Sequence, residues 1–241
     1  MPLLPSRLRR LTPDRLRDDV RLRALAVGAG LIPPRAMHSA EDASVLLDAA
    51  RDARRVIEIG VYEGASAVAL CGVLRAESEL HLVDPFGRHP DALPSGWGAT
   101  EWATRRAVSR ALRRRGPAAP AVHWHVCLSA ELASRWRRDE DPGRPAAEDV
   151  EVDLVFIDGD HSESGCALDW SAWHPFVALG GHVVFHDARA DRPGGRGLPG
   201  PTAVVARHFR SGGGGTEGAG GTPGWEIVAE ADRTVAVRRV A

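Results

Sequence analysis

The 241-residue chain contains no lysine, asparagine or glutamine, and all 31 of its basic residues are arginine. Acidic and basic residues nearly balance, and the formal net charge of −1 indicates neither nucleic-acid nor membrane-surface binding. No apolar run approaches the roughly 20 residues that a membrane-spanning helix needs. The N-terminal stretch has scattered arginines and no apolar core of a signal peptide. These absences favour a cytoplasmic protein without membrane or nucleic-acid partners.

Cysteine is also scarce, and Cys71, Cys127 and Cys166 form no C-x-x-C pair. We therefore expect reduced core cysteines rather than disulfides or a thiolate metal site. A hydrophobic fraction of 44% suffices for one core. We expect a basic helical extension over residues 1–36 and a single domain over residues 37–241.

The stretch Val56–Leu70 organises the rest of the chain. The run Val56-Ile-Glu-Ile predicts a buried strand, Gly60-Val-Tyr-Glu-Gly64 a turn, and Ala65 onward a helix. In this geometry the backbone N–H groups at the helix N-terminus face a ligand, and glycine lets the backbone approach it. Glu58 adds a carboxylate beside the turn.

Alternating strand and helix patterns continue along the chain and end in a predicted hairpin, which indicates an α/β fold. Ser39 and Asp42 form a capping box that opens a helix, and a helix is expected over about 162–177. The further predicted strands are Glu79–Asp84, Ala121–Val126, Val152–Asp158, Gly180–Phe185, Trp225–Glu230 and Thr234–Arg239.

Polar side chains gather where these strands end. Phe156-Ile-Asp-Gly-Asp-His161 and Phe185-His-Asp187 both follow apolar strands, and carboxyl ends of parallel strands form the ligand crevice of an open sheet. We expect Asp158, Asp160, His161, His186 and Asp187 to converge there. Asp84 ends the neighbouring strand, 24 residues after Gly60, where an acid binds ribose hydroxyls. Asp160 and His161 have a second interpretation as turn and helix-capping residues. His38 and His89 lie in segments that could cover the site.

These motifs resemble those of known enzymes. The pattern E-x-G-x-x-x-G-x-S from Glu58 to Ser66 resembles motif I of class I S-adenosylmethionine (SAM) methyltransferases, including the caffeoyl-CoA O-methyltransferase group. The D-G-D-H-S and F-H-D runs resemble those of small bacterial O-methyltransferases. That group includes metal-dependent enzymes that methylate sugar hydroxyls of macrolides and aminocoumarins, and the cephalosporin hydroxylase family. The resemblance spans about residues 37–239.

The resemblance implies a fold and an activity. The fold is a doubly wound, Rossmann-like α/β sheet of seven strands, mostly parallel with the last strand antiparallel. The activity is methyl transfer from SAM to a hydroxyl of a small molecule, a secondary metabolite or its sugar. Related enzymes often form homo-oligomers through N-terminal helices. The implied cofactor-binding residues are Glu58, Gly60, Tyr62, Gly64, Ser66, Asp84, Ser129, Ala130 and Asp158.

The resemblance also implies a divalent metal, Mg²⁺ or Mn²⁺, held by Asp158, His186 and Asp187, with His161 as general base beside a catalytic Asp158. In the well-studied metal-dependent relatives the corresponding pair is often Glu-Asp or Asp-Asn, whereas here it is His186-Asp187. Because the chain has no asparagine, an Asp-Asp-Asn site cannot form. An imidazole suits Mg²⁺ poorly, which shifts the preference toward Mn²⁺, Fe²⁺ or Zn²⁺, or leaves no metal there.

Three alternatives stay open at this point. His161 could act in a metal-independent methyltransferase, in which His186 and Asp187 only shape the pocket. A nicotinamide-dependent oxidoreductase is disfavoured because the turn lacks a third glycine and the chain ends in a hairpin. A SAM-binding module without catalysis would bind cofactor and show no turnover.

Overall fold

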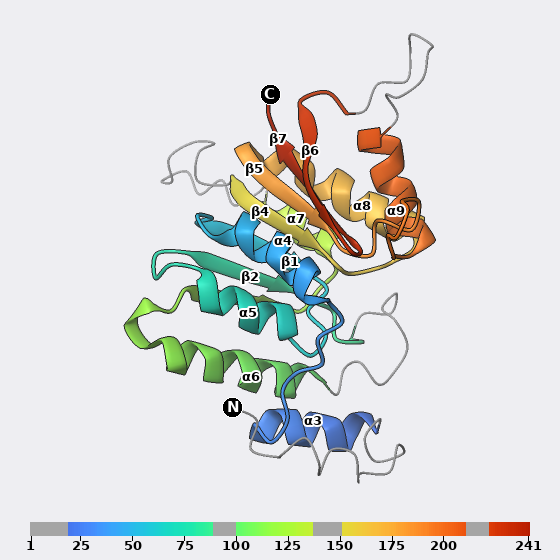
Figure 1. Cartoon of the computed structure of the whole chain (residues 1–241). Helices are drawn as coiled ribbons and strands as arrows, with labels where there is room; N and C mark the ends of the chain where they lie inside the picture. The colour runs from blue at the N-terminus through green and yellow to red at the C-terminus, as the bar shows by residue number, and fades with distance from the viewer. Residues whose placement is uncertain (1–18, 89–99, 137–150, 211–221) are drawn as a thin grey trace, which may run out of the picture.

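One seven-stranded sheet forms the centre of the protein. The computed structural model describes residues 19–88, 100–136, 151–210 and 222–241. The strand order is β3-β2-β1-β4-β5-β7-β6 (Figure 1). Strands β1 to β5 pair in parallel, and β7 lies antiparallel to both β5 and β6. The predicted sheet is confirmed. Its strands are β1 Arg55–Ile59, β2 Glu79–Val83, β3 Ala121–His125, β4 Val152–Ile157, β5 Val177–Phe185, β6 Trp225–Ala231 and β7 Thr234–Arg239.

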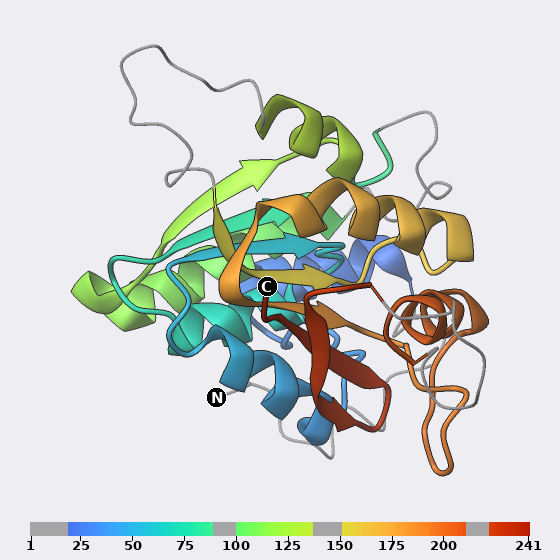
Figure 2. The same ribbon diagram turned by 90° about the horizontal axis from the view of Figure 1, so that it is seen from above.

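Helices cover both faces of the sheet (Figures 1 and 2). Successive residues of a strand point to opposite faces, so Val56 joins the apolar cluster under one helix layer and Ile57 the cluster under the other. Trp170 and Trp173 fill the second cluster and are almost fully buried. One layer holds α4 Ala40–Ala50, α5 Ala65–Val73 and α6 Thr100–Arg115; the other holds α7 Ser129–Trp136, α8 Glu163–Trp173 and α9 Pro199–Val205.

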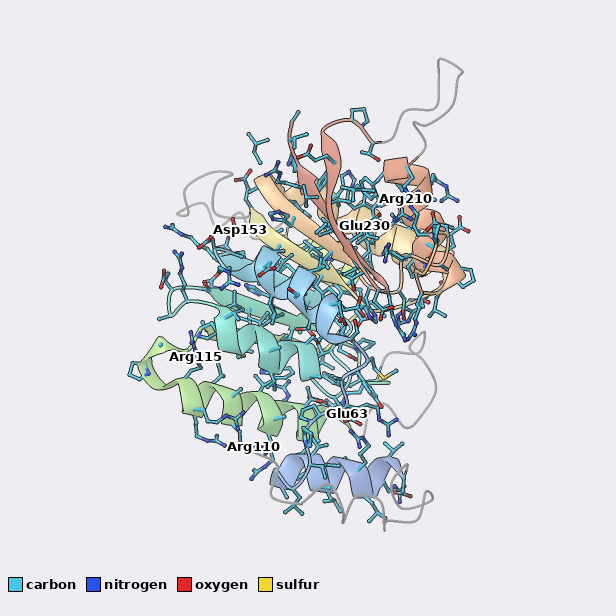
Figure 3. The ribbon with its side chains drawn as sticks, in the orientation of Figure 1. Glu63, Arg110, Arg115, Asp153, Arg210 and Glu230 are labelled. Atoms are coloured by element: carbon cyan, nitrogen blue, oxygen red, sulfur yellow. The ribbon has the colours of Figure 1, made fainter. Side chains whose placement is uncertain are left out.

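The N-terminal helix α3 (Val20–Ala29) packs on α6 instead of the sheet, so that α6 lies between α3 and α5 (Figure 1). Ala24 and Val27 meet Ala103 and Ala107 in a small apolar cluster. The guanidinium of Arg110, labelled in Figure 3, donates to the Gly28 carbonyl at 2.6 Å. This contact satisfies a carbonyl at the C-terminal end of α3. Residues 1–18 of the predicted extension, and His89, lie outside the described residues.

Two predicted boundaries are wrong. Helix α8 ends at Trp173, because His174-Pro-Phe176 forms a 3₁₀ turn and Pro175 lacks the N–H that would continue an α-helix. Strand β5 then begins at Val177 rather than Gly180, and the β4–β5 register shifts between Val152 and Leu154 to accommodate it. Within the described part of the chain, none of the helices combines the length and apolar character needed to cross a bilayer.

Candidate functional site

A cavity of about 780 Å³ opens at the carboxyl ends of β1, β2, β4 and β5. This is the edge at which open α/β sheets bind ligands, and the volume lies within the range of about 300–1,000 Å³ for small-molecule sites. Most of the predicted site residues line it. They are Gly60, Tyr62, Ser66, Asp84, Ser129, Ala130, Asp158, His161, His186 and Asp187.

The glycine turn between β1 and α5 forms one wall of this cavity. Gly60 has φ +86°, and a Cβ there would lie 2.2 Å from the carbonyl oxygen of Asp158. Gly64 has φ +82°, and its Cβ would lie 2.8 Å from a methyl of Thr104. Both positions therefore need glycine for conformation and for close packing. Gly60 lines the cavity, whereas Gly64 is not among its lining residues.

Asp84 holds the glycine turn in place from the end of β2. Its Oδ2 accepts hydrogen bonds from the N–H groups of Val61 and Tyr62 at 2.8 and 2.9 Å, and its Oδ1 accepts one from Phe86 at 2.7 Å. Burial raises the pKa of the carboxyl, and these backbone donors oppose that rise. Asp84 lines the cavity at the position expected for ribose binding, and that role stays a prediction.

Glu58 lies beneath the cavity and is absent from its lining residues. The side chain is fully buried, and the Ser66 hydroxyl donates to its Oε1 at 2.5 Å. Burial raises the pKa of Glu58 to about 8, so the carboxyl is mostly neutral at pH 7. The cofactor-binding role that the resemblance implies for Glu58 therefore stays a prediction, whereas Ser66 does line the cavity.

The opposite wall comes from the start of α7 and from α8. The Ser129 hydroxyl donates to Oδ1 of Asp169, and both residues line the cavity. Burial raises the pKa of Asp169 to about 7. Asp169 was not predicted from sequence, because a lone acid within a helix carries no motif.

The acids and histidines that follow β4 and β5 meet at one end of the cavity. Nδ1 of His186 lies 2.8 Å from Oδ1 of Asp158, and Nε2 of His161 lies 3.3 Å from the same oxygen. Nε2 of His161 also lies 3.4 Å from Oδ2 of Asp187. Asp160 instead accepts a hydrogen bond from the N–H of Ser162 at 2.8 Å, which matches its interpretation as a turn residue.

The side chains of this cluster shift one another's pKa values. Burial on its own would raise the pKa of Asp158, but hydrogen bonds with His161 and His186 outweigh burial and hold that pKa below its usual range. The hydrogen bond to Asp158 raises the pKa of His161. The cluster thus pairs the ionised Asp158 carboxylate with the imidazoles of His161 and His186, whose pKa values are raised.

Three further lining residues carry charge or a titratable ring and were not assigned from sequence. Arg233, at the β6–β7 turn, donates to Oδ1 of Asp187 at 3.3 Å. Arg35 and His38 come from the segment between α3 and α4. Nε2 of His38 lies 3.3 Å from Oδ2 of Asp158. No local motif marks these residues, because long-range folding brings them to the cavity.

Two overlapping groups of side chains could hold a metal ion. They are His38, Asp158 and His186, and His161, His186 and Asp187, with ligand atoms within 4.8 Å of one another in each group. Mixed imidazole and carboxylate donors suit first-row transition metals. The Nε2 atoms of His38 and His186 are buried, and neither has a hydrogen-bond partner among the residues that the structure describes. The donor set therefore fits a divalent transition metal.

The strand order, the reversed β7 and a cavity at the parallel strand ends define the Rossmann-like methyltransferase fold. The family model Methyltransf_24, described as a methyltransferase domain, matches residues 57–188. The match covers more than half of the chain, and the chain belongs to this family. A search of curated protein sequences finds no match for this chain.

Solved structures share the fold at low sequence identity. The O-methyltransferase TomG from Streptomyces achromogenes, involved in tomaymycin synthesis and solved with SAM, is 16% identical over 93% of this chain and 91% of its own, with a TM-score of 0.54. A Bacillus cereus O-methyltransferase solved with SAH is 14% identical over 95% and 93%, with a TM-score of 0.53. CalS11, a TDP-rhamnose 3′-O-methyltransferase of calicheamicin biosynthesis, is 14% identical over 96% and 98%, with a TM-score of 0.51.

Proposed function

We propose that this methyltransferase uses SAM to methylate a hydroxyl of a small molecule, a secondary metabolite or its sugar. The observation that carries the proposal is the shared cavity. Asp158, His161 and Asp187 lie close together in a cavity that the glycine turn and Asp84 also line. A methyl donor bound along the strand ends would thus lie in one cavity with the protein residues that bind it and with those that act on the acceptor.

The lining residues support SAM as the cofactor. Gly60, Tyr62 and Asp84 offer a turn backbone and a carboxylate on one wall, and Ser129 and Ala130 face them from the start of α7. The cavity of about 780 Å³ has room for a nucleoside cofactor together with a small acceptor. Relatives of the same fold were solved with SAM or SAH.

When bound, SAM would supply an electrophilic methyl group on its sulfonium: the acceptor oxygen bonds to the methyl carbon as the carbon–sulfur bond breaks, and SAH is the leaving group. A neutral hydroxyl is a poor nucleophile, so the protein must remove its proton. His161 fits this role because its side chain is 34% exposed and lines the cavity. Asp158 and Asp187 flank its Nε2 at 3.3 and 3.4 Å, and their charges stabilise the imidazolium that forms.

We also propose a divalent metal ion held by Asp158, His186 and Asp187. When bound, such an ion would lower the pKa of the acceptor hydroxyl. Arg233 donates to Oδ1 of Asp187, and this contact would orient that carboxylate. The solved structures of the same fold support a small acceptor, since TomG is involved in tomaymycin synthesis and CalS11 is a TDP-rhamnose 3′-O-methyltransferase.

Transfer of a trideuterated methyl group tests the proposal. The full-length protein is incubated with labelled SAM and a panel of sugars, nucleotide sugars and phenols, and products are analysed by mass spectrometry. We expect the label on an oxygen, and we expect loss of transfer in His161→Ala with SAH binding retained. Label on nitrogen or carbon would contradict the proposal. Turnover that survives EDTA would favour the metal-independent methyltransferase. SAH binding without turnover would favour the SAM-binding module without catalysis.

A further inference from the structure

His38 reaches the carboxylate cluster from outside the strand ends. It lies between α3 and α4, and its side chain is 11% exposed. Its Nε2 lies 3.3 Å from Oδ2 of Asp158, and its ring centroid lies 4.7 Å from that of His186. His38, Asp158 and His186 can each offer a ligand atom within 4.8 Å of the others.

The hydrogen bonding of this trio is incomplete. An ionised carboxylate only accepts, so the 2.8 Å bond between Asp158 Oδ1 and His186 Nδ1 places the imidazole proton on Nδ1. Nε2 of His186 is buried and has no hydrogen-bond partner among the described residues. Nε2 of His38 is also buried, and within the described part of the chain it makes no hydrogen bond, although it lies 3.3 Å from Oδ2 of Asp158. In the described ranges, two buried imidazole nitrogens near Asp158 thus lack a hydrogen-bond partner, and a bound cation would take that place.

The backbone on both sides of His38 is fixed. The N–H of Arg35 donates to Oε2 of Glu63 at 2.7 Å, and Arg23 binds both oxygens of the same carboxylate at 2.5 and 2.7 Å. Glu63, labelled in Figure 3, lies between α3 and the sheet. On the other side, Ser39 caps α4 in a reciprocal pair with Asp42. His38 is therefore held in position before any ligand binds, as a metal site requires.

We propose that His38 is a ligand of a divalent transition metal, together with Asp158 and His186. This inference rests on the proposed metal of the methyltransferase site. It adds a ligand from the N-terminal segment and names the class of ion. Two imidazoles and a carboxylate favour Mn²⁺, Fe²⁺, Co²⁺ or Zn²⁺ over Mg²⁺, which prefers oxygen ligands.

Metal binding without turnover tests this assignment. The full-length protein is stripped with a chelator and titrated with Co²⁺, Zn²⁺ and Mg²⁺ by calorimetry, and the visible absorption of Co²⁺ reports its ligands. We expect Co²⁺ and Zn²⁺ to bind more tightly than Mg²⁺. We expect His38→Ala to weaken both by about 100-fold or more and to change the Co²⁺ spectrum. His38→Asp replaces a nitrogen with an oxygen ligand and should shift the preference toward Mg²⁺.

The control variant is His123→Ala, at an exposed position of the edge strand β3, which should bind Co²⁺ like the parent. Circular dichroism verifies that each variant is folded. Equal Co²⁺ affinity and spectra in the parent and His38→Ala would overturn the assignment, as would a parent that prefers Mg²⁺ or binds no divalent ion. SAH binding is measured in the same samples: its presence leaves the methyltransferase proposal standing when the metal assignment fails, and its absence contradicts that proposal separately.

Discussion

The hydroxyl of Ser66 donates to Oε1 of Glu58 at 2.5 Å, from the first turn of α5 to the end of β1. This contact joins the strand and the helix that flank the glycine turn. Burial raises the pKa of Glu58 to about 8 against an ordinary value of 4.5. The pair therefore holds a neutral carboxyl beneath the cofactor wall at pH 7.

Glu58 should make the stability of the protein depend on pH. Between pH 4.5 and 8 the folded state keeps a proton on Glu58 that the unfolded state has released. The stabilisation that this proton gives the folded state is therefore full below pH 4.5 and is lost as the pH rises toward 8. Glu58→Gln keeps an acceptor for Ser66 and removes the titration. Urea unfolding at pH 5, 6.5 and 8 should show a steeper loss for the parent, by up to about 1.4 kcal/mol per pH unit. Parallel profiles for the two proteins would contradict this, and exposed Glu77→Gln is the control.

Gly60→Ala should lower both stability and SAH affinity. Its φ of +86° disfavours any side chain, and a Cβ would lie 2.2 Å from the Asp158 carbonyl oxygen. Strain of this kind costs about 1–3 kcal/mol before the clash is counted. The matched control is Gly72→Ala, in helix α5 with nothing near the added Cβ. That variant should gain up to about 1 kcal/mol from helix propensity. Equal thermal stabilities of the two variants would refute the explanation.

Arg23 and Glu63 should show strong energetic coupling. Glu63 is buried, with its side chain 4% exposed, and Arg23 binds both of its oxygens. Removing one partner of a buried pair costs about 3–5 kcal/mol, because the other charge stays buried. A double-mutant cycle of Arg23→Ala and Glu63→Ala by urea unfolding measures the coupling. Arg51→Ala removes an exposed pair with Asp48 and should change stability by about 0.5 kcal/mol or less. Additive effects of the Arg23 and Glu63 substitutions would contradict the role of this pair.

His161→Ala should separate catalysis from binding. Removal of a general base lowers turnover by about 10²- to 10⁴-fold. The affinity for SAH should change little, because Ser129, Asp84 and the glycine turn lie at the other walls of the cavity. Single-turnover kinetics and calorimetry measure the two quantities. A variant that keeps full turnover would exclude His161 as the base.

The fold was readable from sequence because strand periodicity, the glycine turn and the closing hairpin are local features. The β5 boundary was not, since pairing at Val177 depends on a register shift in the neighbouring strand. Because parallel strands end at one edge of a sheet, the sequence predicted the proximity of four site residues, which are Asp158, His161, His186 and Asp187. His38 could not be assigned, because its place depends on the ion pair of Arg23 with Glu63, 40 residues apart.

Arg233, near the other end of the chain, also could not be assigned to the site from sequence. Its N–H donates to Oδ1 of Asp42 at 3.0 Å, across 191 residues, while its guanidinium reaches Asp187. No sequence pattern within the β6–β7 turn predicts either of these contacts. The residues that complete this site therefore come from both ends of the chain, and the strand ends supply its centre.

A crystal structure of the full chain with SAH tests the central claim most directly. We expect the nucleoside between Asp84 and Ser129, and the sulfur directed toward Asp158, His161 and Asp187. SAH bound outside this cavity, or with its sulfur turned away from these three residues, would contradict the account.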